Sequence, residues 1–238
     1  MIRVLLPRRS AAGTVAALSA ALLTVAVVLG GLLLLDVARP VFQDMDNSWH
    51  DFSATVHTPL WDAVNPALNW AGYRGMLAFH IVLAFALIVG QRPISAAFSA
   101  TAGLAVVLVT QLAKWAIGRE RPADNRVFSD NGSYPSGHVS ATTAFLLVLA
   151  LLLGRWWVWM LSLAGIFAMM LSRTYLAAHW FTDVVGGACL SAGMVLLLWL
   201  AFQDICIREN MNAVHTLIWW SRASRRRKAT GQAESAPR

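Results

Sequence analysis

The stretch SAAGTVAALSAALLTVAVVLGGLLLL, residues 10–35, contains 26 successive residues without a charged side chain. A helix needs about 17–25 predominantly apolar residues to cross the hydrocarbon core of a bilayer, so this stretch is long enough to span a membrane. The whole chain has the same character, because 58% of its 238 residues are apolar and only 13% are charged. Soluble domains carry about 25% charged residues, so we expect an integral membrane protein.

Five further apolar stretches are separated by charged residues and are long enough, or nearly long enough, to cross a bilayer. The two that contain 17 residues are marginal, but flanking side chains can reach the interface by snorkelling. We therefore expect an all-α protein with a six-helix transmembrane bundle in residues 10–207. The five stretches are residues 75–91, 93–113, 135–154, 156–172 and 184–203.

The first stretch could also be a cleaved secretory signal, because Arg8 and Arg9 precede it. Its apolar region is too long for a signal peptide, and residues 36–40 make a poor cleavage site. We expect an uncleaved first span that follows a short N-terminus, residues 1–9.

Lysines and arginines near the span ends predict the orientation, because they are enriched on the cytoplasmic side. Alternation of six helices places 12 of the 19 on one side, together with both termini, and we expect that side to be the cytoplasm. Residues 208–238 are predicted to be a basic cytoplasmic tail, disordered from residue 229. Its basic run at 225–228 is expected to face anionic lipid headgroups and not nucleic acid, because no separate basic domain with interleaved aromatic residues is present.

The first outer loop, residues 36–74, contains five aspartates. The alternation in FQDMDNSWHD, residues 42–51, faintly resembles a calcium-binding loop, but the glycine at position six and the acidic residue at position twelve are missing. We expect no metal site there. We expect short amphipathic helices within residues 49–70 that lie on the outer membrane surface and turn their apolar side to lipid. That side carries Trp61, Val64, Leu68 and Trp70.

Polar residues gather at four span ends, which the alternation places together on the outer face. Ionisable residues at membrane depth are costly and indicate function by default. Lys114 and Arg121 are seven residues apart, or two helical turns, so they can point the same way before Pro122 ends the helix. Together they suit one phosphate group, with arginine as a bidentate fork and lysine as a point charge. Arg119 and Arg126 are interpreted as snorkelling residues at the ends of spans.

The fourth expected span begins with Pro135-Ser136-Gly137-His138. The backbone N–H groups of Ser136 and Gly137 then lie at a helix N-terminus, which favours an anion. Gly137 lets the anion approach the backbone, the Ser136 hydroxyl adds a donor, and His138 stands at the rim. Taken alone, the tetrapeptide is equally compatible with an ordinary helix start and an interfacial histidine.

Arg173 ends the fifth expected span, and His179 and Asp183 open the sixth. At a spacing of i and i+4, the carboxylate can hold one ring nitrogen of His179 and leave the other to attack an electrophile. The alternative is a structural His–Asp hydrogen bond at a helix start.

These residues form three spaced motifs: Lys114-x6-Arg121-Pro122, then Pro135-Ser136-Gly137-His138, then Ser172-Arg173-x5-His179-x3-Asp183. The set resembles the signature of the type 2 phosphatidic acid phosphatase superfamily, which also includes vanadium haloperoxidases. The resemblance extends over roughly residues 46–203 and has no departure at a signature position.

The resemblance implies a role for each residue. His179 would attack phosphorus to form a phosphohistidine, Asp183 would orient it, and His138 would protonate the leaving group and then activate water. A second group would bind the phosphate oxygens without a metal or any other cofactor: Lys114, Arg121, Ser136, Gly137 and Arg173.

The expected activity is a metal-independent phosphatase acting on a lipid phosphate or diphosphate at the outer face of a bacterial inner membrane. A polyprenyl diphosphate of the undecaprenyl type is the expected substrate, with phosphatidylglycerophosphate and phosphatidate as alternatives. A vanadium haloperoxidase is less expected, because that branch is soluble and much larger. A lipid or anion transporter has no need of the pair formed by His179 and Asp183.

Overall fold

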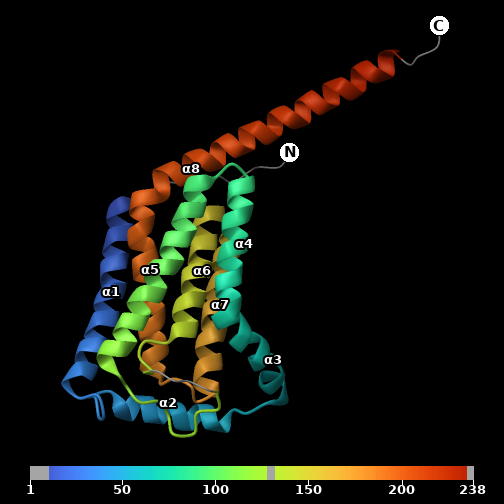
Figure 1. Cartoon of the computed structure of the whole chain (residues 1–238). Helices are drawn as coiled ribbons and strands as arrows, with labels where there is room; N and C mark the ends of the chain where they lie inside the picture. Colours follow the sequence, from blue (N-terminus) through green and yellow to red (C-terminus); the bar gives the residue numbers. More distant parts are fainter. Residues whose placement is uncertain (1–10, 128–131, 235–238) are drawn as a thin grey trace.

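The computed structural model describes residues 11–127 and 132–234, without the side chains of residues 73, 74 and 212–234. Helices and their connecting turns make up this part of the chain, which contains no strand. Most helices run side by side in a bundle, and one long helix projects from it (Figure 1). The expectation of an all-α protein is confirmed. The predicted N-terminus at residues 1–9 and the last four residues lie outside the described residues.

Within the described residues, four helices are long and apolar enough to cross a membrane. They are α1 (Ala12–Leu35), α5 (Pro93–Ile117), α7 (Trp156–Tyr175) and the Phe181–Met211 part of α8 (Phe181–Glu234). Two shorter apolar helices, α4 (Met76–Val89) and α6 (Gly137–Leu153), stand beside them (Figure 1). With 14 and 17 residues, these two span about 21 and 26 Å, less than the roughly 30 Å of hydrocarbon. The count of six spans therefore stays a prediction.

The centre of the bundle is apolar and lies between α5, α6 and α8. Phe98, Val106, Val148 and Trp199 are almost fully buried there. Large apolar side chains also cover the outside, where α1, α4, α5 and α7 present exposed valines, leucines and tryptophans. Helices that are apolar on every side are expected of membrane spans, because lipid replaces water as their surroundings.

Helix α1 packs along α8, and small residues allow the close approach. Ser19 donates a hydrogen bond to the backbone oxygen of Gly193 at 2.8 Å. A Cβ at Gly193 would lie 2.7 Å from Cγ of Leu23, so glycine is needed at this crossing. Further along α1, the Tyr134 hydroxyl donates to the Ala26 oxygen at 2.6 Å. The first helix is thus bound to the last helix and to the loop that precedes α6.

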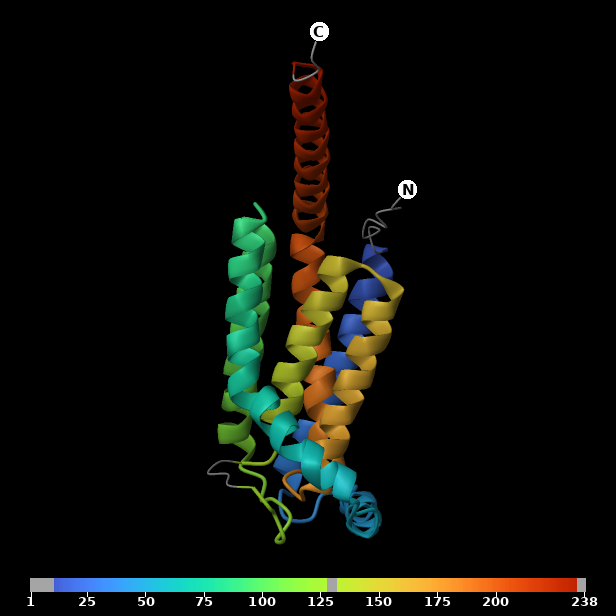
Figure 2. The same ribbon diagram turned by 90° about the vertical axis from the view of Figure 1, so that its right-hand side faces the viewer.

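Two short helices cross one end of the bundle, α2 (Gln43–Thr55) and α3 (Pro59–Trp70), followed by a π-helical turn at Ala71–Gly75 (Figure 2). They occupy the segment in which the sequence predicts amphipathic helices, although α2 begins before residue 49. Leu68 packs against a small buried cluster around Met169, while Val64 and Trp70 are exposed. The location of these helices on a membrane surface stays a prediction.

Helix α8 continues to Glu234, whereas the sequence predicts disorder from residue 229. The difference has a simple local reason, since no glycine or proline interrupts the chain between Gly193 and Gly231. Glu209 of α8 accepts hydrogen bonds from the backbone N–H groups of Ile94 and Ser95 at 2.7 and 2.8 Å. This carboxylate caps the start of α5 and joins the two helices at the end opposite α2 and α3.

Candidate active site

The residues of the three motifs come together at the bundle end that α2 and α3 cross. Lys114 lies in the last turn of α5, and Arg173 in the last turn of α7. Ser136 caps the start of α6, where Gly137 and His138 form the first turn. Asp183 lies in the first turn of α8, while Arg121 and His179 come from connecting loops. The structure therefore brings the predicted site residues into one region, from helix ends and from loops.

His179 lies between a carboxylate and a cation. Its Nδ1 is 3.6 Å from Oδ2 of Asp183, and its Nε2 is 3.2 Å from Nη1 of Arg121. Burial lowers the pKa of His179 to about 4; the nearby carboxylate of Asp183 opposes this shift, and the charges of Lys114 and Arg121 add to it. The imidazole is therefore neutral at neutral pH. With its proton on Nδ1, facing Asp183, the imidazole has its lone pair on Nε2, where it accepts from Nη1 of Arg121.

The spacing predicted that His179 and Asp183 share one face of a helix. In the structure they do not. Helix α8 begins at Phe181, so His179 precedes it. Asp183 instead accepts a hydrogen bond from the backbone N–H of Trp180 at 2.9 Å. This capping contact folds the turn back over the carboxylate and holds His179 beside it.

Arg119 is a site residue that the sequence analysis misassigned. It was interpreted as a snorkelling side chain, but only 2% of it is exposed. One guanidinium nitrogen, Nη1, donates to Oγ1 of Thr182 and to Oδ1 of Asp183, both at 2.8 Å. The other, Nη2, donates to Oε1 of Gln43 at 2.9 Å and to Oδ2 of Asp46 at 2.7 Å. A fixed fork of donors can join four acceptors in this way, which a lysine could not do.

Asp46 comes from α2, outside the three motifs, and its side chain is fully buried. Besides Arg119, it accepts hydrogen bonds from the backbone N–H and the hydroxyl of Thr182 at 2.9 and 2.7 Å. The weak resemblance to a calcium loop included this aspartate, but in the structure its charge is balanced by Arg119. Helix α2 is thereby joined to the start of α8, directly behind Asp183.

Lys114 and Arg121 approach each other from a helix and a loop, and not along one helix as predicted. Helix α5 ends at Ile117, because Gly118 adopts a left-handed conformation with φ of 62°. Nζ of Lys114 donates to the Gly132 oxygen, to which Nη2 of Arg121 also donates at 3.4 Å. This shared acceptor ties both cations to the same loop.

Arg173 is fully buried and is held by α3. Its Nη1 donates to Oδ1 of Asn69 at 2.7 Å, and its Nη2 donates to the Ser172 hydroxyl at 2.8 Å. That hydroxyl donates in turn to Oδ1 of Asn65 at 2.5 Å. Asn65 and Asn69 were not singled out in the sequence, although their spacing of four residues on an amphipathic helix was a usable signal.

His138 faces the π-helical turn that follows α3. A Cβ at Gly72 would lie 3.0 Å from Cδ2 of His138, so the turn passes directly over the imidazole. The ring also makes a hydrogen bond with the backbone of Asn69. The same asparagine thus contacts His138 through its backbone and Arg173 through its side chain.

The helix start at Ser136 differs in one respect from the predicted anion site. Its backbone N–H, one of the two donors assigned to an anion, donates to the Asp183 oxygen at 3.0 Å. Its hydroxyl is buried and has no hydrogen-bond partner within the described parts of the chain. The side chain of Ser136 is therefore the donor that remains for a ligand, beside the backbone at Gly137.

Comparisons with known proteins give a match to the sequence and a match to the fold. A sequence model described as the PAP2 superfamily matches residues 92–206, which include all three motifs. The structure resembles a crystal structure of "the first transmembrane PAP2 type phosphatidylglycerolphosphate phosphatase from Bacillus subtilis", with a TM-score of 0.67 and 18% sequence identity. The likeness covers 78% of this chain and 95% of that chain, and it shows a shared fold. No curated protein matches the sequence.

Proposed function

Residues 92–206 match the sequence model of the PAP2 superfamily, and from this match we propose that the protein is a membrane phosphatase that hydrolyses lipid phosphates or diphosphates through a phosphohistidine intermediate. The observation that carries the proposal is the environment of His179. A neutral imidazole has one nitrogen toward a buried carboxylate and the other among cationic side chains. This is the arrangement that a nucleophile needs for attack on an anionic phosphate.

The first step forms a bond between Nε2 of His179 and phosphorus and breaks the bond to the leaving oxygen. The Nδ1 proton stays on the ring, where Asp183 stabilises the charge that develops on it. Protonated His138 gives a proton to the leaving oxygen and becomes neutral. In the second step, His138 accepts a proton from water, whose oxygen attacks phosphorus and releases His179 and inorganic phosphate.

Cationic side chains compensate the charge on the phosphoryl oxygens during both steps. Lys114, Arg121 and Arg173 supply that charge, and the Ser136 hydroxyl with the backbone at Gly137 supplies further donors. Preorganised donors of this kind do the electrostatic work that magnesium does in other phosphoryl-transfer sites. The reaction is therefore proposed to be independent of metal ions.

Two residues outside these roles position Asp183. Arg119 bonds its Oδ1, and Asp46 fixes Arg119 from the opposite side. A buried carboxylate is costly unless it is paired and hydrogen-bonded, and this pair fulfils both conditions. We assign Arg119 and Asp46 as positioning residues that act through Asp183.

The proposed substrate is a polyprenyl diphosphate of the undecaprenyl type, hydrolysed at the outer face of a bacterial inner membrane with both chain termini in the cytoplasm. The basic tail, residues 208–238, would follow the six-span domain on that side. Phosphatidylglycerophosphate is the second candidate substrate, and the name of the structurally similar Bacillus subtilis protein favours it. Both lipids present a phosphate at headgroup depth.

The test is phosphate release by detergent-purified protein from undecaprenyl diphosphate, phosphatidylglycerophosphate and phosphatidate. His179→Ala should release none, and radiolabelled phosphate should be trapped on the parent protein in an acid-labile form. His80→Asn is a matched control, because His80 belongs to α4 and its side chain contacts Ser99 of α5, away from the site. If His179→Ala kept the rate of the parent on these lipids, the proposed mechanism would be wrong.

A further inference from the structure

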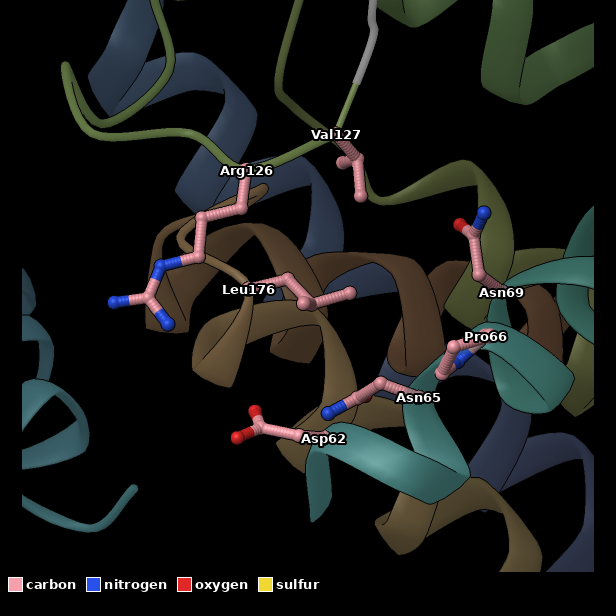
Figure 3. Close-up of a pocket in the computed structure, with 7 residues that line it drawn as sticks. All are labelled: Asp62, Asn65, Pro66, Asn69, Arg126, Val127 and Leu176. Atoms are coloured by element: carbon pink, nitrogen blue, oxygen red, sulfur yellow. The ribbon is translucent and has the colours of Figure 1, made fainter. Parts of the chain in front are cut away.

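A cavity of about 280 Å³ opens beside the candidate site, between α3 and two connecting loops (Figure 3). One wall is α3. The other is formed by Arg126 and Val127, in the loop between α5 and α6, and by Leu176, which follows α7. The mechanism proposed above uses none of the residues that line it, which are Asp62, Asn65, Pro66, Asn69, Arg126, Val127 and Leu176.

The inner wall of the cavity is continuous with the phosphate site. Asn69 accepts from Arg173 at 2.7 Å and contacts His138 through its backbone. Asn65 reaches Arg173 through the Ser172 hydroxyl. The cavity therefore lies at the side of Arg173 and His138, and not at the side where Arg121 contacts His179.

The location of the cavity beside Arg173 and His138 fits the leaving group of the proposed reaction. In an in-line displacement the leaving oxygen departs opposite the nucleophile, so the groups that surround the general acid also surround the leaving group. If His179 attacks and His138 protonates, the part of the substrate beyond the scissile bond extends toward α3. At about 280 Å³, the cavity is slightly smaller than the usual ligand pocket of about 300–1,000 Å³, which suits a small polar group and not a lipid tail.

The chemistry of the lining indicates a group rich in oxygen. Asn65 is only 3% exposed, and its Nδ2 has no hydrogen-bond partner within residues 11–127 and 132–234. In Figure 3 that nitrogen points into the space between Asp62 and Leu176. A buried donor left unpaired costs about 1–3 kcal/mol, which a ligand oxygen would recover.

Charged groups of both signs stand at the rim. The Arg126 guanidinium is exposed and lies 3.1 Å from Nδ1 of His57, with donors left for a ligand. Asp62 accepts from the Tyr175 hydroxyl at 2.6 Å through Oδ1. The rim can therefore donate to an anionic oxygen and accept from a hydroxyl group.

We propose that this cavity binds the oxygen-rich leaving group of the substrate, with Asn65 and Arg126 as donors and Asp62 as an acceptor. The inference rests on the proposed phosphatase function and adds a subsite that selects among its substrates. The second phosphate of a diphosphate and the glycerol part of a glycerophosphate share this chemistry, whereas the leaving group of p-nitrophenyl phosphate carries no phosphate or hydroxyl chain.

The experiment compares kcat/KM of the full chain in detergent on farnesyl diphosphate, phosphatidylglycerophosphate and p-nitrophenyl phosphate. Asn65→Asp keeps the oxygen that accepts from Ser172 but replaces the free donor by a negative oxygen. The ratio of kcat/KM on the oxygen-rich substrates to that on p-nitrophenyl phosphate should fall by about tenfold or more. Arg126→Gln, at an exposed position, should lower the same ratio by about threefold or more.

Asp124→Asn is the matched control, because this loop carboxylate contacts His50 and does not line the cavity. Its ratio should stay that of the parent. A fall confined to farnesyl diphosphate identifies the occupant as a phosphate, and a fall confined to phosphatidylglycerophosphate identifies it as a glycerol group. Either result supports the subsite.

Equal losses on all three substrates, or no loss on any, would overturn the subsite while leaving the phosphatase function intact. A parent protein that released phosphate from none of them would instead overturn the function. If Asn65→Asp did not fold, the exposed Arg126→Gln variant would decide the question by the same ratio.

Discussion

Replacement of Arg119 by glutamine tests whether the residues behind the proposed nucleophile set its reactivity. Arg119 makes a 2.8 Å hydrogen bond to Oδ1 of Asp183 and a 2.7 Å contact with Asp46. A hydrogen bond to a charged group contributes about 1.5–3 kcal/mol, and about 1.4 kcal/mol corresponds to a factor of ten. If the bond to Asp183 is needed in the transition state, kcat/KM falls about 10- to 100-fold.

The pH profile separates positioning from a general loss of structure. His179 must be neutral to attack, and its pKa is lowered to about 4. The parent should therefore lose activity on the acid side near pH 4, and not near the ordinary histidine value of about 6.5. Without the Arg119 cation, Asp183 stabilises protonated His179 more strongly, so the pKa of His179 rises and the acid limb moves to higher pH.

The assay is phosphate release from one substrate across the pH range, so that ionisation of the substrate is common to all variants. Arg119→Lys keeps the charge and should leave the acid limb near that of the parent while activity falls. Arg208→Gln removes an exposed arginine at the other end of the bundle and serves as the control. An Arg119→Gln variant with reduced activity but an unmoved acid limb would refute the positioning role.

Three other results are expected. His138→Ala should slow hydrolysis of a lipid phosphate more than that of p-nitrophenyl phosphate, whose leaving group needs no proton; equal losses would remove His138 as the general acid. Activity should survive EDTA, and a loss restored by magnesium would contradict the cationic pocket. Gly186→Ala should lower the melting temperature in detergent through a clash with the Tyr134 ring that costs about 1–3 kcal/mol, whereas Gly31→Ala, in open space, should not.

The sequence predicts the apolar helices and the meeting of the motif residues at one end of the bundle, because both depend on local patterns. Apolar stretches around residues 10–35 and 93–113 correspond to α1 and α5. Alternating direction along the chain was sufficient to gather Lys114, His138 and Arg173 at one end of the bundle. Predicting that these residues meet requires only the lengths of the helices and their order along the chain.

What the sequence did not predict depends on how loops turn and on which side chains meet across them. The left-handed Gly118 ends α5 early, so Arg121 reaches the site from a loop and Arg119 turns inward. The contacts of Asp46 and Asn69 need the docked positions of α2 and α3, which hydropathy does not encode. The buried hydrogen-bond partners of Asp46 and Asn69 can therefore be identified only from the three-dimensional structure.

The packing of α1 along α8 has a consequence for biosynthesis. A ribosome makes α1 long before α8, so α1 enters the membrane without the surface that it will bind. The loop before α6, which Tyr134 attaches to α1, also lies against α8 through the hydrogen bond from Ser136 to Asp183. The candidate site therefore stays incomplete until the first and last helices have met in the membrane.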